Sequence, residues 1–134
     1  MTNIPRGIRN SNPFNIVKSN NDWVGKVEGG PDERFETFKD AVYGIRAGIK
    51  LLINYKKQGF DTVEKIIGKF APPFENNTKE YISHVSKKLG VLPTEIVELT
   101  DDVLHDFAVA IITMENGCTP YSDTVILNAI KMAK

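Results

Sequence analysis

The sequence predicts a single domain that is mainly α-helical (α+β), with a small β-flap near its N-terminus. The chain has 134 residues, which is enough for one hydrophobic core and few for two. After residue 39, apolar residues recur at the spacing of a helix face through most of the sequence. Before residue 39, turn-forming residues and short alternating runs prevail. We therefore expect an N-terminal segment with a flap over residues 1–38 and a helical body over residues 39–134.

The flap is predicted from two short runs on either side of a turn. Residues 6–16 are rich in turn formers, and extended structure is expected to begin near Asn15. Residues 23–28 and 34–38 combine β-propensity with partial alternation of apolar and polar side chains. The sequence Gly-Gly-Pro-Asp at residues 29–32 lies between them and is a strong turn signal. We expect a β-hairpin or a three-stranded flap.

Helix-capping residues and chain breakers divide the helical body into short helices. Asp40 precedes the first amphipathic run, and Pro72 with Pro73 prevents the second helix from continuing. Thr100 and Ser122 are typical N-cap residues for two helices near the C-terminus. The helices predicted in this way span residues 41–57, 61–70, 78–89, 94–99, 101–115 and 124–132.

Composition narrows the possible functions. The 17 basic and 17 acidic residues give a formal net charge of zero without a basic stripe, so no nucleic-acid partner is expected. A single cysteine, Cys118, and two distant histidines, His84 and His105, do not predict a disulfide framework or a metal site, and no cofactor is expected. The apolar runs are too short to span a membrane, and the N-terminus lacks the apolar core of a signal peptide. We expect a monomer that is made and kept in a cytoplasm unless another factor releases it.

Glu115 is the strongest candidate for a catalytic residue. It follows Phe107 and Ile111 at helical spacing, so it lies on an apolar stripe where an unused charge is costly. Gly117 is expected to end this helix, which places Glu115 in the last turn. Burial and the helix dipole at that end both favour the neutral form of a carboxyl group, which a general acid needs. The alternative is that Glu115 reaches solvent at a frayed helix end.

Two carboxylates facing one cleft are typical of glycoside cleavage. The candidates for a partner to Glu115 are Glu28, Asp32, Glu36 and Glu75. Each of them is alternatively a surface carboxylate without a specific role. Trp23 and Tyr81 adjoin polar loops and could stack on sugar rings, although most aromatic residues are expected in the core. No histidine is placed to activate Cys118 as a nucleophile.

Several stretches together resemble a family of bacteriophage and prophage proteins that degrade peptidoglycan. In chain order they are Arg6-Gly-Ile-Arg-Asn-x-Asn-Pro-x-Asn-Ile16, Trp23-x-Gly25, Asp32-x-x-Phe35-x-x-Phe38, Gly44-Ile-Arg-Ala47, Ala71-Pro-Pro-x-Glu-Asn-x-Thr78-x-x-Tyr81, Ala110-Ile-Ile-x-x-Glu-Asn-Gly117 and Pro120-Tyr121. The series covers nearly the whole chain, and the family it resembles includes endolysins and virion-associated lytic transglycosylases. The sequence departs from the usual pattern at Phe14, at Val17 and at Thr113-Met114.

The resemblance implies a lysozyme-like fold that is circularly permuted relative to bacterial glucosaminidase and transglycosylase domains, because the Glu-Asn-Gly helix comes nearly last here. Such a permutation requires the two chain ends to lie close together. By the resemblance, Glu115 corresponds to the catalytic acid. The residues expected around the sugar cleft are Asn15, Glu28 and the other flap carboxylates, Glu75, Asn76, Thr78, Tyr81 and Tyr121.

The function that follows is cleavage of the β-1,4 bond between N-acetylmuramic acid and N-acetylglucosamine in peptidoglycan glycan strands. We expect a muramidase of the endolysin type, in which Glu115 protonates the leaving oxygen and Asp32 or another flap carboxylate assists water. In a lytic transglycosylase, the muramyl 6-hydroxyl would attack instead and give a 1,6-anhydro product. A third possibility is a non-catalytic virion or peptidoglycan-binding protein. The expected location is the host cytoplasm until release to the cell wall, or the phage particle.

Overall fold

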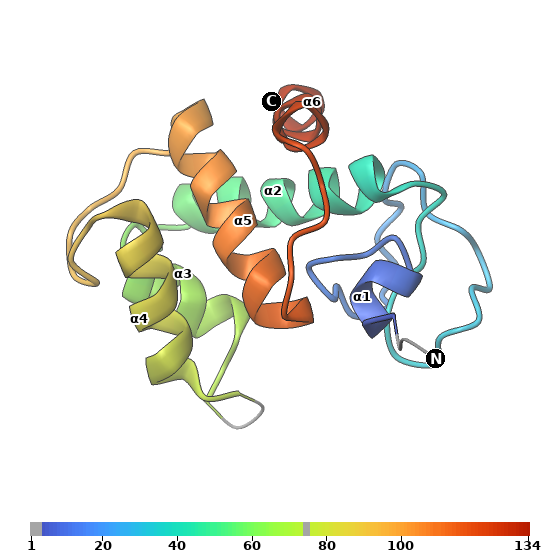
Figure 1. Cartoon of the computed structure of the whole chain (residues 1–134), viewed down its shortest axis with the longest axis horizontal. Helices are drawn as coiled ribbons and strands as arrows, with labels where there is room; N and C mark the ends of the chain where they lie inside the picture. The colour runs from blue at the N-terminus through green and yellow to red at the C-terminus, as the bar shows by residue number, and fades with distance from the viewer. Residues whose placement is uncertain (1–3, 74–75) are drawn as a thin grey trace.

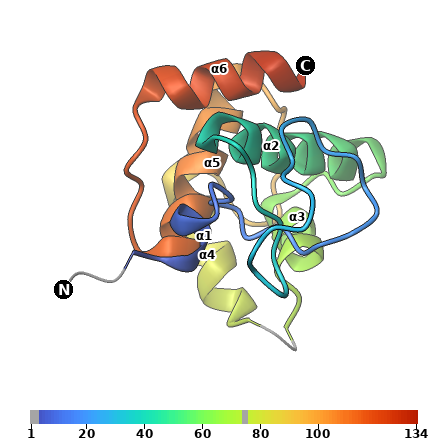
Figure 2. The same cartoon turned by 90° about the vertical axis from the view of Figure 1, so that its right-hand side faces the viewer.

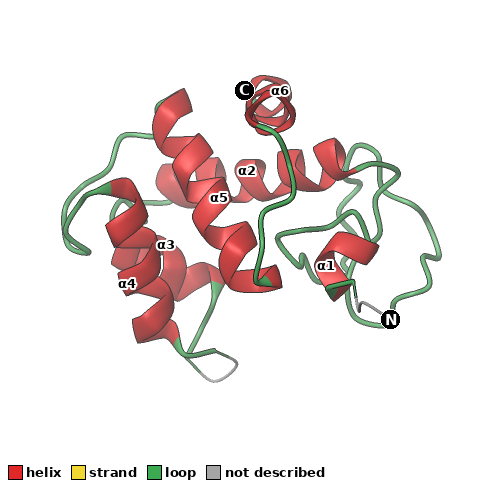
Figure 3. Ribbon diagram, viewed as in Figure 1, coloured by secondary structure: helices red, strands yellow, loops and turns green. Residues whose placement is uncertain are grey.

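The computed structural model describes residues 4–73 and 76–134, and it is mainly helical as the sequence predicts (Figure 1, Figure 3). The helices of this part of the chain are α1 (Arg6–Arg9), α2 (Ala41–Lys57), α3 (Val63–Phe70), α4 (Thr78–Leu89), α5 (Asp101–Asn116) and α6 (Asp123–Ala133). No helix among the described residues is long and apolar enough to cross a bilayer.

Helices α3, α5 and α6 pack against α2, and α1 packs against α5 (Figure 1, Figure 2). α6 packs along α2, α5 crosses it, and α4 packs against both α3 and α5. The packed faces carry fully buried side chains such as Leu52 of α2, Phe107 of α5 and Ile126 of α6. Burial of these apolar faces is the main source of stability for helices of this length. The loops of the N-terminal segment lie at one end of this body, next to α1 (Figure 2).

The helix ends follow the capping signals in the sequence. Thr62, Asn77, Thr100 and Ser122 each accept a hydrogen bond from the backbone N–H three residues ahead, so each satisfies a free donor at a helix start. Asp40 precedes α2, but its side chain makes no such hydrogen bond.

The predicted β-flap is not formed as regular strands. Residues 11–38 make only the isolated bridges Val17–Phe35 and Lys26–Phe38. The side-chain amide of Asn12 links these loops in place of the backbone hydrogen bonds of a β-sheet. It donates to the carbonyls of Ile16 (3.0 Å) and Glu36 (2.9 Å) and accepts from the Ile16 N–H (2.9 Å).

The prediction also missed α1, a single helical turn inside the turn-rich stretch.

The helix predicted over residues 94–99 is also wrong. This segment runs beside the start of α3, where Ile96 forms a bridge with Thr62. The Val97 N–H donates to the Asp61 carbonyl (2.9 Å), and the Glu64 N–H donates to the Pro93 carbonyl (3.1 Å). These long-range backbone bonds satisfy groups that a local helix would otherwise have paired.

The start of the described chain, at α1, and the end of α6 do not lie side by side (Figure 1, Figure 2). In both views α1 lies beside the end of α5, whereas the C-terminus lies at the end of α6 (Figure 1, Figure 2). The structure therefore does not confirm a simple circular permutation. It does place the N-terminal segment directly against the Glu-Asn-Gly end of α5, which brings Glu115 into contact with residues from the start of the chain.

Candidate active site

Glu115 lies in the last turn of α5, as the sequence predicts, with Gly117 in the left-handed conformation at φ 77° ending the helix. The side chain is half-buried, and both of its oxygens are held. Oε1 accepts a hydrogen bond from Asn15 Nδ2 at 2.9 Å, and Oε2 accepts one from the Tyr81 hydroxyl at 2.8 Å. Two donors from different parts of the chain therefore fix the position of this carboxyl group.

Asn15 reaches Glu115 from an unusual backbone conformation. Its φ of 53° lies in the left-handed region, which asparagine tolerates better than most residues. The Asn15 and Asn116 side-chain oxygens press against Gly7 of α1, where a Cβ atom would come within 2.7 Å and 2.5 Å of them. Asn116 Nδ2 also donates to the Pro13 carbonyl at 2.8 Å. A glycine at position 7 is therefore required for the close approach of α1 to the end of α5.

Tyr81 of α4 is the second residue that holds Glu115. Its side chain is only 3% exposed. Burial, together with the neighbouring Glu115, raises the pKa of the Tyr81 hydroxyl well above its usual range, so it remains a hydrogen-bond donor at any physiological pH. The ring packs edge-on against Phe70, which packs in the same way against Phe14. This row of rings holds Tyr81 in place behind Glu115.

Glu115 opens into a cleft with a volume of about 370 Å³. Most of the residues that line it are apolar or aromatic, but Asn15, Arg34, Asn76 and Glu115 are polar or charged, and polar atoms make up more of its exposed surface than apolar atoms. The cleft is lined by Phe14, Asn15, Ile16, Val17, Arg34, Phe35, Leu51, Tyr55, Phe70, Ala71, Asn76 and Glu115. Aromatic walls with a few polar groups are typical of sites that bind a sugar or another small organic ligand.

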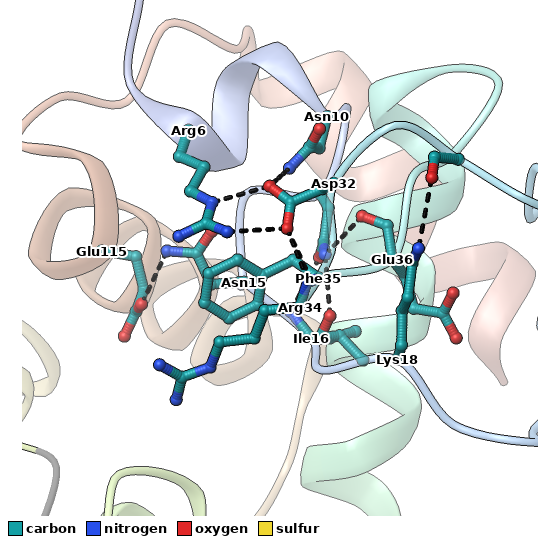
Figure 4. A network of polar contacts seen from close by, with 12 residues as sticks. Arg6, Asn10, Asn15, Ile16, Lys18, Asp32, Arg34, Phe35, Glu36 and Glu115 are labelled. Atoms are coloured by element: carbon teal, nitrogen blue, oxygen red, sulfur yellow. Dashed lines mark hydrogen bonds and ion pairs between the residues drawn. The ribbon is translucent and has the colours of Figure 1, made fainter.

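Asp32 does not line this cleft among the described residues, and its carboxylate is occupied (Figure 4). Arg6 contacts both of its oxygens at 2.6 Å and 2.8 Å, and Asn10 Nδ2 donates to it at 3.0 Å. The backbone N–H groups of Arg34 and Phe35 donate to it at 2.9 Å each. With its lone pairs engaged in this way, Asp32 anchors the loop at residues 32–35 to α1, and no contact among the described residues connects it with Glu115.

The Asp32 ion pair predicts a pH dependence of stability. The Arg6 guanidinium, helped by the Phe35 N–H, holds the pKa of the Asp32 carboxyl well below its usual range. Its stabilising effect is therefore fully present above the unfolded-state pKa of about 3.9 and is lost as the pH falls toward the lower folded-state value. We expect Asp32→Asn to lower the melting temperature at neutral pH and to flatten its decline below about pH 4. Thermal melts from pH 7 to pH 2 test this, and parallel curves for the two proteins would contradict it.

The other predicted site residues are distributed as follows. Asn76 lines the cleft with Glu115, whereas Thr78 donates to the Ala71 carbonyl at 2.7 Å at the start of α4. Glu28 is 81% exposed beside Lys26. Glu75 lies outside the described residues.

Among the described residues, Glu36, Tyr121 and Trp23 do not line the cleft. Glu36 is 1% exposed and forms an ion pair with Lys26 at 3.2 Å. Tyr121 is half-buried, and its burial, with Cys118 and Asp40 nearby, raises the pKa of its hydroxyl to about 12. Trp23 packs against the core.

Sequence reasoning missed the residues that organise the site from α1 and from the loop at residues 32–35. Arg6, Gly7 and Phe35 occur in the stretches that carry the family resemblance, but nothing in their spacing indicated a contact with Asp32 or Asn116. No feature of the sequence indicated that Arg34 lines the cleft. Within residues 4–73 and 76–134, no group of three or more His, Cys, Asp and Glu side chains is placed to hold a metal ion.

Comparison with known proteins finds a relative from a bacteriophage. It is 40% identical over 121 residues to Protein P5 of Pseudoalteromonas phage PM2, and the match covers 87% of this chain and 74% of that protein. The chain therefore belongs to the family of this phage protein. No protein-family model matches it.

Proposed function

We propose that this protein cleaves the glycan strands of peptidoglycan at the β-1,4 bond between N-acetylmuramic acid and N-acetylglucosamine, with Glu115 as the general acid. The observation that supports this most is the placement of Glu115, whose two oxygens are held by Asn15 and Tyr81 at the wall of the cleft. A carboxyl group held in place at a cleft can act as the general acid that protonates a leaving glycosidic oxygen. Membership of a phage protein family fits this activity, since a phage must pass the host wall.

The reaction would proceed in two proton transfers through one carboxyl group. Protonated Glu115 donates its proton to the glycosidic oxygen as the bond from that oxygen to C1 of the muramyl ring breaks. The resulting carboxylate accepts the proton of the muramyl 6-hydroxyl while that oxygen bonds to C1. The products are a new glycan end and a 1,6-anhydro-muramyl end, and Glu115 is protonated again. Asn15 and Tyr81 stabilise the carboxylate between the two transfers.

We favour this transglycosylase route because it uses Glu115 alone. Hydrolysis would use a second carboxylate to assist the water. Of the predicted candidates, Asp32 is held by Arg6 and Asn10, and Glu36 is buried against Lys26. Moving either of them to a water beside the substrate would break these contacts.

The products released from purified peptidoglycan test the proposal. Mass spectrometry of the muropeptides distinguishes 1,6-anhydro-muramyl ends from reducing muramyl ends. Anhydro ends support the route above, and reducing ends would show that the protein is a muramidase with a second group that activates water. Binding to the wall without any released product would contradict cleavage and would indicate a non-catalytic peptidoglycan-binding protein of the phage particle.

Tyr81→Phe should slow cleavage while leaving binding nearly unchanged. The variant keeps the buried ring but removes the hydroxyl that donates to Glu115 Oε2. A hydrogen bond to a charged group contributes about 1.5–3 kcal/mol, so we expect kcat to fall about ten-fold or more with a similar KM. Tyr43→Phe is a matched control because Tyr43 is a half-buried tyrosine of α2 that does not line the cleft among the described residues. Equal kinetics for Tyr81→Phe and wild type would show that Tyr81 does not position the acid.

A further inference from the structure

We propose that a groove between α4 and the loop that follows it binds the peptide stems of the glycan strand, which are acidic peptides with small apolar side chains. This inference rests on the proposed function, because it assigns a binding site for a second part of the same substrate. The groove has a volume of about 490 Å³, which is typical of ligand sites. Among the described residues, it shares no lining residue with the cleft that holds Glu115.

One wall of the groove is a single face of α4. Tyr81, which holds Glu115, lies about 200° around the helix axis from Lys79, at 100° per residue. The helix therefore separates the groove from the cleft. The residues of α4 that line the groove recur at three- and four-residue spacing on that far face, and they are Lys79, Ile82, Ser83, Ser86 and Lys87.

The other wall is apolar and is formed by Val91, Leu92 and Pro93 in the loop after α4. Leu92 is 67% exposed, and methyl groups of a bound peptide would cover apolar surface that now faces water. The loop is tied to the helical body, because the Glu64 N–H of α3 donates to the Pro93 carbonyl at 3.1 Å. Figure 1 shows the loop at the outer edge of α4. A wall that is already held in place costs less entropy when a ligand binds.

The charges of the groove favour an anionic ligand. Lys79 and Lys87 line it, and neither makes an ion pair or a hydrogen bond with a described residue. Glu95 is the carboxylate that lines the groove among the described residues, and its Oε1 already accepts the Leu92 N–H at 3.2 Å. Two ammonium groups are therefore available to the carboxylates of a peptide stem.

Ser86 adds an unpaired polar group to the same wall. The residue is 4% exposed, and its hydroxyl has no hydrogen-bond partner among the described residues. A buried hydroxyl without a partner is unusual, because its lost hydrogen bonds to water are not replaced. A peptide is rich in amide donors and acceptors, so a stem in the groove would offer the missing partner.

A stem is long enough to reach the groove from the cleft. Asn76 lines the cleft and Lys79 lines the groove, and three residues of chain span at most about 11 Å. A helix with its side chains is about 10–12 Å across. A five-residue stem extends over roughly 17 Å. A strand held in the cleft can therefore place the stem of a muramyl group in the groove.

A stem peptide without sugar tests the inference without any need for turnover. The probe is N-acetyl-L-Ala-γ-D-Glu-L-Lys-D-Ala-D-Ala, titrated into ¹⁵N-labelled wild-type protein while the backbone amide signals are followed by NMR. We expect the signals of Val91 and Leu92 to shift and saturate, and the signal of Glu115 to stay in place. The absence of shifts at Val91 and Leu92 with the peptide at about 5 mM would overturn the inference.

Variants of α4 test the role of the charges. Replacing both Lys79 and Lys87 by Ala should weaken binding of the stem peptide about 5- to 30-fold, because two charge pairs are lost. Lys88→Ala is the matched control, since Lys88 is an exposed lysine of the same helix that does not line the groove among the described residues. An equal loss of affinity for the control and the double variant would contradict a role of the groove lysines.

A second peptide separates a stem from a segment of a partner protein. It has the same side chains, but all of its residues are L and its glutamate is linked through the α-carboxyl group. Tighter binding of the stem peptide supports the inference, and equal affinity for the two peptides would overturn the stem assignment in favour of a protein segment. Failure of wild-type protein to release muropeptides would overturn the proposed reaction, whereas the peptide titration involves no glycan and reports on the groove alone.

Discussion

Replacement of Glu115 by Gln is expected to reduce the release of soluble muropeptides by at least 10²- to 10⁴-fold, which is about the contribution of a general acid. Gln has nearly the same size and can keep both contacts, since a tyrosine hydroxyl accepts as well as donates. It has no proton of suitable acidity to give to the leaving oxygen. The loss should therefore appear in kcat, with the fold intact. Mass spectrometry of digested peptidoglycan measures the rate, and a thermal melt within about 3 °C of wild type verifies folding.

A matched variant separates this effect from a general change in charge. Glu64 is an exposed carboxylate in the first turn of α3 and does not line the cleft among the described residues, so Glu64→Gln should digest peptidoglycan at the wild-type rate. If Glu115→Gln retains more than about a tenth of the activity, Glu115 is not the general acid, because that loss is smaller than one proton-transfer group contributes.

Gly44→Ala is expected to destabilise the fold more than any other small substitution considered. A Cβ atom at this position of α2 would lie 2.1 Å from the Ser11 carbonyl oxygen and 3.1 Å from the Asn12 Cα. These are backbone atoms of the turn whose Asn12 side chain holds the N-terminal loops together, so they cannot move aside cheaply. We expect a loss of about 3 kcal/mol in the free energy of unfolding and a fall in melting temperature of about 10 °C.

A second glycine provides the control for helix propensity. At Gly68 in α3, a Cβ atom would meet no other atom within 4 Å, so Gly68→Ala should raise stability by up to about 1 kcal/mol. Chemical denaturation of both variants measures the difference. Similar effects at the two positions would show that close packing of α2 on the Ser11 turn is not what requires glycine at position 44.

The helical body was predictable because its signals are local. The start of α5 after Thr100 follows from a capping side chain, and the ends of α4 and α5 at Gly90 and Gly117 follow from glycines that adopt positive φ. The N-terminal loops were not predictable in the same way. There the side chain of Asn12 replaces a strand ladder, and β-propensity gives no information about which side chain pairs with which backbone.

Glu115 could be singled out from the sequence because an acidic residue on an apolar helix face stands out, and the structure places it where that argument put it. Asp32 illustrates the opposite case. Its type and its place in a predicted flap indicated a catalytic carboxylate, but the structure gives it Arg6 as a partner 26 residues away. A carboxylate that anchors a loop and one that faces a substrate look the same in sequence.

The sequence by itself predicted helices α2 to α6 and the candidate acid, because helical periodicity, capping and the cost of a buried charge act over a few residues. Only the tertiary structure decided which groups hold that acid. Asn15 and Tyr81 are 100 and 34 residues from Glu115, and they meet it because α1, α4 and the end of α5 pack together. Such contacts depend on how the surfaces of helices far apart in the sequence fit together. Periodicity and capping rules describe only neighbouring residues, so they do not predict these contacts.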